Sequence, residues 1–270
     1  MKIPKEIVDG YTEILPSIFE LVPNNTYHQV DGLSKTNLCD ISESVSYYHM
    51  KKNKPDDPTD SMIKGSALHD LVLLPDEFKK NYVVSPVHTK TAKAYKKCIE
   101  DNPDKMVLSI RDSDDVHYMR DSLYANPSIR SILESKSILR EVSIWAEHPA
   151  TGLLVKVRPD LISDGIIFDL KSTNSPHQFG FIHSVYKFQY QVQSAYYQDV
   201  CQLNGMTISD FQFIVVGSKP PYLTAIYNLN PELVEEGRAR YNEALQTYKN
   251  YLDSDDKWDG LPYGREVVTL

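Results

Sequence analysis

The middle of the chain alternates between apolar and polar residues in the pattern of two paired strands. Leu153, Val155 and Val157 alternate with Lys156 and Arg158, the period of two that is typical of a half-buried strand. A turn signal containing glycine follows at 163–165, and a second apolar segment begins at residue 166. The sequence therefore predicts a β-hairpin whose second strand ends at residues 169–171.

Apolar residues repeat at helical spacing in four other regions. This spacing predicts helices over 61–74, within 114–139, over 185–203 and from 231 to 252. Strands are predicted over 82–86, 139–147, 153–162, 211–216 and 222–229. In the first 60 residues Ser34 is expected to cap a short helix carrying Leu38 and Ile41, and 51–60 reads as a loop. The order helix, three strands, helix, two strands, helix predicts one α/β domain over 61–252, with residues 1–60 packed on it and 253–270 as a tail.

Composition is typical of a soluble protein and does not select a function. The chain has 270 residues, of which 41% are hydrophobic, and a net charge of −8. No apolar run approaches a membrane span, and the start lacks the apolar stretch of a secretory signal, so we expect a cytoplasmic protein without membrane contact. Three widely spaced cysteines fit neither a disulfide framework nor a zinc site. The acidic balance argues weakly against a nucleic-acid coat protein but does not exclude a nuclease.

The predicted hairpin brings two carboxylates and an ammonium together. If the strands pair around the 163–165 turn, Asp160 lies near Asp169, and Lys171 shares the face of Asp169 because side chains two apart point the same way. Mg²⁺ prefers carboxylate oxygens, and it makes a bound water more acidic. Lys171 would position the attacking water and offset charge on the phosphate. A surface hairpin with an ordinary salt bridge is the alternative interpretation of these three residues alone.

Four motifs occur in an order that resembles a known nuclease superfamily. The chain resembles the RecB-like branch of the PDDEXK nucleases, and within that branch it is most similar to the RecE-type (exonuclease VIII) phage recombination exonucleases. The runs Gly65 to Phe78 and Glu141 to Trp145 support the narrower resemblance, which covers roughly residues 25–250. The four motifs are Gly65-x-x-x-His69, Arg158-Pro159-Asp160, Asp169-x-Lys171 and Gln193-x-x-x-Tyr197.

The resemblance implies a fold and a set of metal ligands. The fold is a PDDEXK (restriction-endonuclease-like) core, a central mixed sheet flanked by helices, with N-terminal helical additions. Asp160, Asp169 and the Leu170 carbonyl would hold Mg²⁺, for which Mn²⁺ would substitute, and His69 would contribute to a second ion. Lys171 would be the catalytic lysine and Glu141 an auxiliary acid. The second carboxylate is an aspartate here rather than the more usual glutamate, which should shift the metal slightly.

DNA contacts are expected from the helix that follows the hairpin. The resemblance implies that Gln193 and Tyr197 contact DNA phosphates and support the catalytic lysine. Gln189 falls on the same helical face at four-residue spacing, and Arg158 shares the Asp160 face, so both are candidates for phosphate contacts. The structural alternatives are a core histidine for His69 and simple helix–sheet packing for Gln193 and Tyr197.

The resemblance further implies a Mg²⁺-dependent 5′→3′ exonuclease that acts on double-stranded DNA ends and leaves 3′ single-stranded overhangs. It also implies a ring-shaped homo-oligomer, for which a tetramer is favoured and a trimer is the alternative, and a RecT-type single-strand annealing protein as partner. One rival is another PDDEXK nuclease, either an endonuclease or a CRISPR-associated end-trimming exonuclease. Such end-trimming relatives carry an iron–sulfur cluster on four cysteines, and this chain has three. The other rival, an inactive DNA-binding module, is disfavoured by the intact Asp160, Asp169 and Lys171 set.

Overall fold

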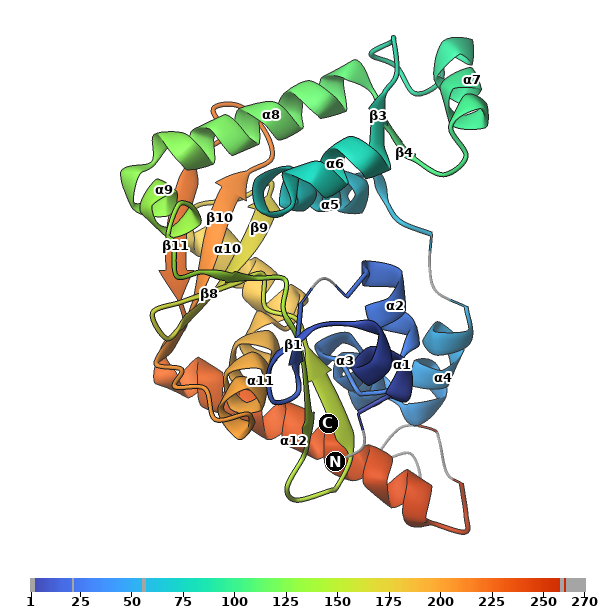
Figure 1. Cartoon of the computed structure of the whole chain (residues 1–270), viewed down its shortest axis with the longest axis vertical. Coiled ribbons are helices and arrows are strands. Elements are labelled where there is room, and N and C mark those ends of the chain that lie inside the picture. The colour runs from blue at the N-terminus through green and yellow to red at the C-terminus, as the bar shows by residue number, and fades with distance from the viewer. Residues whose placement is uncertain (1–2, 21, 55–56, 258–259, 261–270) are drawn as a thin grey trace.

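The computed structural model describes residues 3–20, 22–54, 57–257 and 260. The helices are α1 (Lys5–Gly10), α2 (Asn24–Gln29), α3 (Lys35–Glu43), α4 (Val45–Asn53), α5 (Asp60–Leu73), α6 (Pro75–Asn81), α7 (Lys93–Asp101), α8 (Ile110–Ala125), α9 (Pro127–Leu133), α10 (Gln178–Lys187), α11 (Tyr190–Leu203) and α12 (Pro231–Asp253). The strands are β1 (Glu13–Leu15), β2 (Ile18–Phe19), β3 (Tyr82–Val84), β4 (Met106–Leu108), β5 (Leu139–Arg140), β6 (Ser143–Glu147), β7 (Leu154–Val157), β8 (Leu161–Ser163), β9 (Ile166–Thr173), β10 (Asp210–Gly217) and β11 (Thr224–Asn228). The largest sheet lies between helices, and the short β3 and β4 strands lie apart from it, near α6 and α7 (Figure 1).

A five-stranded mixed sheet forms the core of the fold. Its order is β11-β10-β9-β8-β5, with β9 and β10 parallel and the other neighbours antiparallel. The central strands β9 and β10 are apolar on both faces, as expected of strands covered on both sides. Ile167 and Phe213 face one hydrophobic cluster, whereas Phe168 and Ile214 face the other. The predicted α/β class with a mixed sheet flanked by helices is confirmed.

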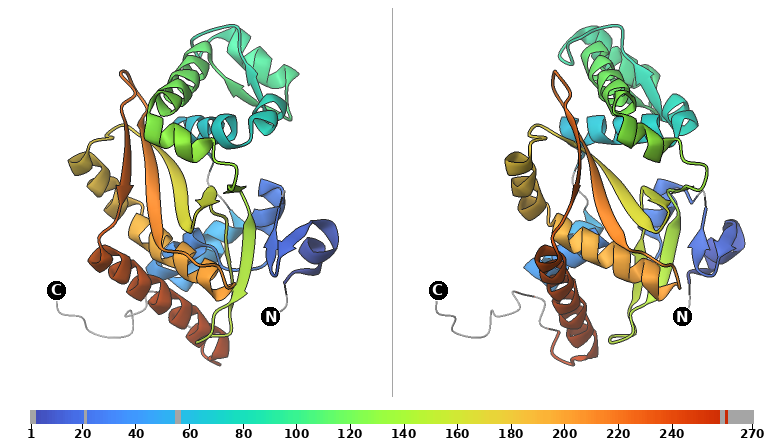
Figure 2. Two further views of the ribbon diagram at one scale, coloured as in Figure 1. Left: turned by 60° about the vertical axis from the view of Figure 1, so that its left-hand side comes forward. Right: turned by 90° about the vertical axis from the view of Figure 1, so that its left-hand side faces the viewer.

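The helices divide between the two faces of this sheet. Helices α10 and α11 cover one face, with α3 and α12 packed behind them, while α5, α8 and α9 cover the other face (Figure 2). Helix α12 begins at Pro231 behind the Asn230 cap, as the sequence predicts, because proline suits the first helical position. Ser34 likewise caps α3 through a complete capping box with Asn37.

Each of two strands predicted from the sequence is interrupted, and its two halves belong to different sheets. The predicted strand 139–147 splits at Glu141, whose φ of 51° ends β5 before β6 begins. The predicted strand 153–162 splits between β7 and β8. Strands β6 and β7 join β1 and β2 in a separate antiparallel sheet, whereas β5 and β8 belong to the five-stranded one. The Glu141 N–H donates to the Asp160 carbonyl at 3.1 Å, so the two crossings lie side by side.

The predicted helix 185–203 is also broken. Gln189 has φ 52° and ψ 50°, a left-handed conformation that ends α10 and precedes the first residue of α11. Only residues 190–203 continue as the expected helix, so Gln189 is not on a shared helical face with Gln193 and Tyr197. The predicted loop 51–60 begins later than expected because α4 runs to Asn53.

Residues from the N-terminal part complete the small sheet and are fixed to it by two cations. Strand β2 pairs with β6. The buried Lys156 donates to the carbonyls of Tyr27 and Val30 at 2.6 and 2.5 Å. Arg158 donates to the Val22 carbonyl at 2.9 Å, and its guanidinium lies 4.1 Å from the Tyr27 ring centroid. The predicted tail lies mostly outside the described residues. In the ranges that are described, no helix combines the length and the apolar character needed to cross a membrane.

Candidate active site

The candidate site lies at the edge of β9 where the β8 pairing stops. The last paired residues are Leu161 and Phe168, so the register places Asp160 opposite Asp169, as the hairpin prediction requires. The Asp160 Oδ2 atom accepts the Leu170 N–H at 2.7 Å and so takes the place of a further strand. Because the N–H and C=O of one strand residue project to the same edge, the Leu170 carbonyl is directed toward this edge as well.

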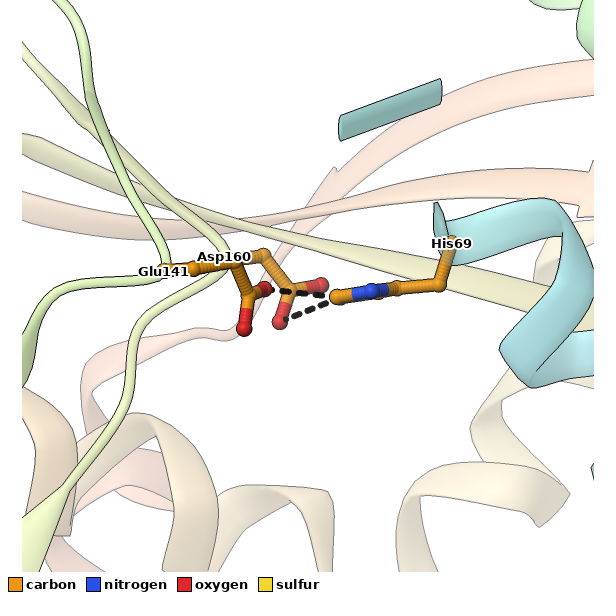
Figure 3. A group of neighbouring side chains, drawn as sticks. All are labelled: His69, Glu141 and Asp160. Atoms are coloured by element: carbon orange, nitrogen blue, oxygen red, sulfur yellow. Dashed lines mark ion pairs between the residues drawn. The ribbon is translucent and has the colours of Figure 1, made fainter. Parts of the chain in front are cut away.

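A histidine and two carboxylates converge on one side of this edge. His69 comes from α5, Glu141 from the crossing between β5 and β6, and Asp160 from the crossing between β7 and β8 (Figure 3). The His69 Nε2 atom lies 3.1 Å from Glu141 Oε1 and 3.1 Å from Asp160 Oδ1. Each residue offers one possible ligand atom, and these three atoms all lie within 4.8 Å of one another. Strands that change sheets thus bring together three residues that are far apart in the sequence.

The electrostatics of this group fit a bound cation. Burial opposes protonation of His69, but the charges of Asp160 and Glu141 outweigh it and hold the pKa of His69 well above its usual range. Burial raises the pKa of the Glu141 carboxyl, and the nearby Asp160 charge adds to the effect. Burial also acts to raise the pKa of Asp160, yet His69 outweighs it and holds that pKa below the ordinary value. His69 therefore supplies the largest share of the positive charge that faces both carboxylates.

Asp169, Lys171 and Gln193 form a second group on the α11 side of β9. The Lys171 Nζ atom lies 2.5 Å from Asp169 Oδ2, and Gln193 Nε2 donates to Asp169 Oδ1 at 2.5 Å. Asp169 is 2% exposed, and burial raises its pKa to about 6 despite the Lys171 charge. Burial acts to lower the pKa of Lys171, but Asp169 outweighs it, so the pKa of Lys171 is raised and the ammonium stays protonated.

The donor set fits a hard divalent ion. It offers carboxylate oxygens and one imidazole nitrogen, which suit Mg²⁺ or Mn²⁺. Two buried oxygens, Glu141 Oε1 and Asp169 Oδ2, accept no hydrogen bond from any described residue although each faces a cationic side chain. The ligand group joins Asp160 to His69 and Glu141, whereas Asp169 lies outside it because its carboxylate turns toward Lys171 and Gln193. Asp160 and Asp169 therefore influence each other through their charges in this structure. A single metal ion bound by both carboxylates stays a prediction.

The remaining predicted residues surround the two groups. Tyr197 lies one turn after Gln193, and burial holds the pKa of its hydroxyl well above the usual range, with Asp169 and Asp160 adding to the effect. Arg158 uses its guanidinium to hold Ser143 and Val22, so a DNA phosphate contact by this residue stays a prediction. Gln189 lies at the corner between α10 and α11 rather than on the face of Gln193.

Two residues that lie near Lys171 are not among the site residues predicted from the sequence. The Tyr190 ring centroid is 5.0 Å from the Lys171 Nζ atom. Lys35, the first residue of α3, interacts electrostatically with Lys171 and Asp169, and burial lowers its pKa. Tyr190 stands one helical turn before Gln193 and is detectable as a neighbour of that motif. No sequence signal identifies Lys35, because only the packing of α3 against the α10–α11 corner brings it near the site.

The first group opens into a cleft of about 1250 Å³. One wall comes from α5, α6 and the segment before β4, and the other from residues 22–25. The lining includes five basic side chains and four acidic ones, besides His69: Lys80, Lys105, Arg140, Arg158 and Lys171, against Asp70, Glu77, Asp104 and Glu141. Because the basic and acidic side chains nearly balance, the cleft is not strongly cationic.

Comparisons with known proteins agree with this fold. A family model described as a PDDEXK-like domain of unknown function (DUF3799) matches residues 33–258. A crystal structure described as "Putative exonuclease" from Eubacterium rectale is similar over 92% of this chain and 95% of its own, at 14% identity and TM-score 0.61. An alkaline exonuclease from Laribacter hongkongensis aligns over 61% of this chain and 86% of its own, at 15% identity and TM-score 0.30, which is too loose to bear on the fold. A search of curated proteins finds no match.

Proposed function

The chain belongs to the family of PDDEXK-like domains of unknown function that matches residues 33–258, and from that membership and the site we propose that it is a divalent-metal-dependent deoxyribonuclease. The observation that carries the proposal is the convergence of His69, Glu141 and Asp160 next to Lys171, at a sheet edge that opens into a cleft. Carboxylates and one imidazole beside a buried ammonium match the needs of phosphodiester hydrolysis.

The residues divide the work between holding a cation and stabilising the phosphate. His69, Glu141 and Asp160 would hold a divalent ion, together with the Leu170 carbonyl. When bound, that ion supplies positive charge to the phosphate oxygens and makes a water more acidic. Lys171 stays protonated and donates hydrogen bonds to the phosphate oxygens as negative charge develops.

Gln193 supports this arrangement without touching the reacting atoms. Its amide holds one oxygen of Asp169, and the other oxygen of Asp169 faces the Lys171 ammonium. The direction of the lysine is therefore fixed through a buried chain of contacts from α11 to β9. We assign Gln193 as a positioning residue and propose that Tyr197, one turn later, borders the phosphate path.

The finer proposal is a Mg²⁺-dependent 5′→3′ exonuclease on double-stranded ends that leaves 3′ overhangs, with two ions in each site. Support comes from the order of the four motifs and from Asp169, which provides a further carboxylate beside the first group. The proposal extends to a ring-shaped homo-oligomer, a RecT-type annealing partner and a cytoplasmic location.

Hydrolysis of linear duplex DNA tests the proposal directly. The wild-type protein should degrade a linear duplex in Mg²⁺ or Mn²⁺ and leave it intact in EDTA. A duplex labelled at its 5′ or 3′ end reports the polarity, and a closed circle of the same sequence reports endonuclease activity. Equal loss of DNA with and without EDTA, or no loss with either metal, would refute the nuclease proposal. Rapid cutting of the closed circle would contradict the exonuclease assignment and would indicate an endonuclease of the same fold.

A further inference from the structure

The corner between α10 and α11 presents an aromatic ring to solvent beside the candidate site. Phe188 is 48% exposed although it lies between two helices. Its ring stacks on Tyr190 with centroids 5.6 Å apart and planes at 29°, and Tyr190 stacks in the same way on the buried Phe213 at 5.4 Å. Three rings thus form a ladder from the core to the surface, and its outermost ring is the exposed one.

This ladder is adjacent to the predicted catalytic lysine and is flanked by further cations. The Tyr190 ring lies 5.0 Å from Lys171 Nζ. Lys35 Nζ donates to the Phe188 carbonyl at 2.5 Å, and the exposed Lys187 places its ammonium 5.2 Å from the Phe188 ring centroid. The left-handed Gln189 backbone between Phe188 and Tyr190 sets the corner at which both rings stack. A non-glycine residue in this conformation costs free energy, which the surrounding packing has to offset.

The surrounding sequence contains no negative charge. The chain has 37 acidic residues among 270, yet none occurs between Asp169 and Asp199. The same stretch carries Lys171 and Lys187. Helix α10 and the corner after it therefore carry the cation of Lys187 but no acidic residue of their own, a composition that suits contact with phosphates.

We infer that Phe188, stacked on Tyr190 and flanked by Lys35 and Lys187, is a stacking platform for a nucleobase of single-stranded DNA next to the phosphate held at Lys171. Aromatic faces interleaved with cations are the usual means of binding single strands without sequence readout. In the free protein the Lys187 ammonium lies over the ring, and a base that displaces it leaves the ammonium free to pair with a phosphate. The inference deepens the proposed nuclease function and rests on it.

The exposed residues of α10 continue this surface away from the site. Phe179 is 84% exposed and Tyr186 is 51% exposed. They are seven residues apart and therefore lie on one face of the helix. An acid-free helix with exposed aromatic rings extends from the corner toward the upper end of β9 (Figure 2). A single strand leaving the site has a surface of the right chemistry to follow.

Substitution of Phe188 tests the inference with a matched control. Tyr118 on α8 is also exposed and stacks on Tyr222 at 5.6 Å and 27°, but it lies on the opposite face of the sheet from the corner. We compare F188L, F188W and Y118L with the wild type. One assay is the binding of a single-stranded 12-mer carrying 2-aminopurine in EDTA, since that base loses fluorescence when it stacks. The other is cleavage of linear duplex DNA in Mg²⁺.

F188L should weaken binding of the 12-mer about 5- to 100-fold and abolish the fluorescence quench, in line with the usual effect of removing one stacking contact. In cleavage it should raise KM more than it lowers kcat, while Y118L remains close to the wild type and F188W, which keeps an aromatic face, retains the fluorescence quench. An active F188L enzyme with unchanged quench, affinity and KM would overturn the inference and leave the nuclease proposal standing. An inactive wild type in Mg²⁺ and Mn²⁺ would overturn both. A change of oligomeric state by F188L in sedimentation would assign the surface to a second copy of the chain and would also overturn the inference.

Discussion

The two sides of β9 carry similar charges but arrange them differently. On the α5 side, His69, Glu141 and Asp160 come from three separate elements and face a cleft. On the α11 side, Asp169, Lys171 and Gln193 form a set in which both oxygens of the Asp169 carboxylate face a partner, while Lys171 also lines the cleft. The first side takes most of its positive charge from His69, with smaller contributions from Arg158 and Lys171, whereas the second contains its own ammonium.

This difference indicates a division of roles. A group of two carboxylates balanced by one titratable histidine can exchange that proton for a metal ion. A buried carboxylate fixed by a lysine and an amide keeps the lysine charged and oriented. We therefore expect variants of the two sides to separate metal binding from catalysis, and the predictions below test this separation.

The largest effect is expected from Asp160→Asn. The amide keeps the size of the side chain but removes the charge that faces His69 and the proposed ion. DNA cleavage should fall at least about 1000-fold, because an essential group of a catalytic unit is lost. Mg²⁺ should also cease to raise the melting temperature, as measured by differential scanning calorimetry. A variant that Mg²⁺ stabilises as much as the wild type would show that Asp160 is not a ligand.

Lys171→Met should abolish most turnover yet keep metal binding. Removing one buried donor to a developing negative charge costs about 100- to 1000-fold in rate. The loss of the ammonium also leaves Asp169 buried without its cation, so its pKa should rise further and the carboxyl should bind a proton. Calorimetric titration with Mg²⁺ should still give a binding signal from the α5 side. Loss of that signal would mean that the two sides do not act separately.

Metal binding should strengthen as pH rises. The folded protein holds Asp169 at a pKa of about 6, above its ordinary value of 3.8, so the folded state binds more protons between these values. The contribution of Asp169 to stability is therefore present at pH 4 and is lost as pH rises toward 6. A divalent ion offsets the negative charge that appears, and it also competes with the proton on His69. The Mg²⁺-induced rise in melting temperature should be larger at pH 7.5 than at pH 5, and a pH-independent rise would contradict this.

The smallest effect is expected from Gln189→Gly at the corner of the α11 side. Glycine adopts the observed φ of 52° without the steric penalty of a side chain. The variant should be more stable by about 1 kcal/mol, which corresponds to the cost of a left-handed non-glycine residue. The midpoint of urea denaturation should move upward, with Gln198→Gly inside α11 as the opposing control, since glycine weakens a helix. A lower midpoint for Gln189→Gly would indicate that the Gln189 side chain contributes contacts that outweigh the strain.

Local patterns in the sequence determined many of the helices and strands and part of the site, although not the breaks at Glu141, between β7 and β8, and at Gln189. The alternation over 153–158, the 163–165 turn and the apolar run from 166 predict the hairpin, and the hairpin alone places Asp160 opposite Asp169. Capping signals such as Ser34 and Asn230 are equally local. These features follow from the sequence because each depends on residues within a few positions of one another.

Only the tertiary structure decided which side chains meet. Glu141 and Asp160 reach His69 because two strands change sheets, and that crossing depends on the pairing of β6 with β2 and of β8 with β9 rather than on local propensity. Lys35 approaches Lys171 through the packing of α3, which no spacing along the chain encodes. Asp169 turned toward Lys171 and Gln193 because a buried carboxylate takes the nearest cation and donor. The sequence determines the local elements, while long-range pairing and burial determine their chemistry.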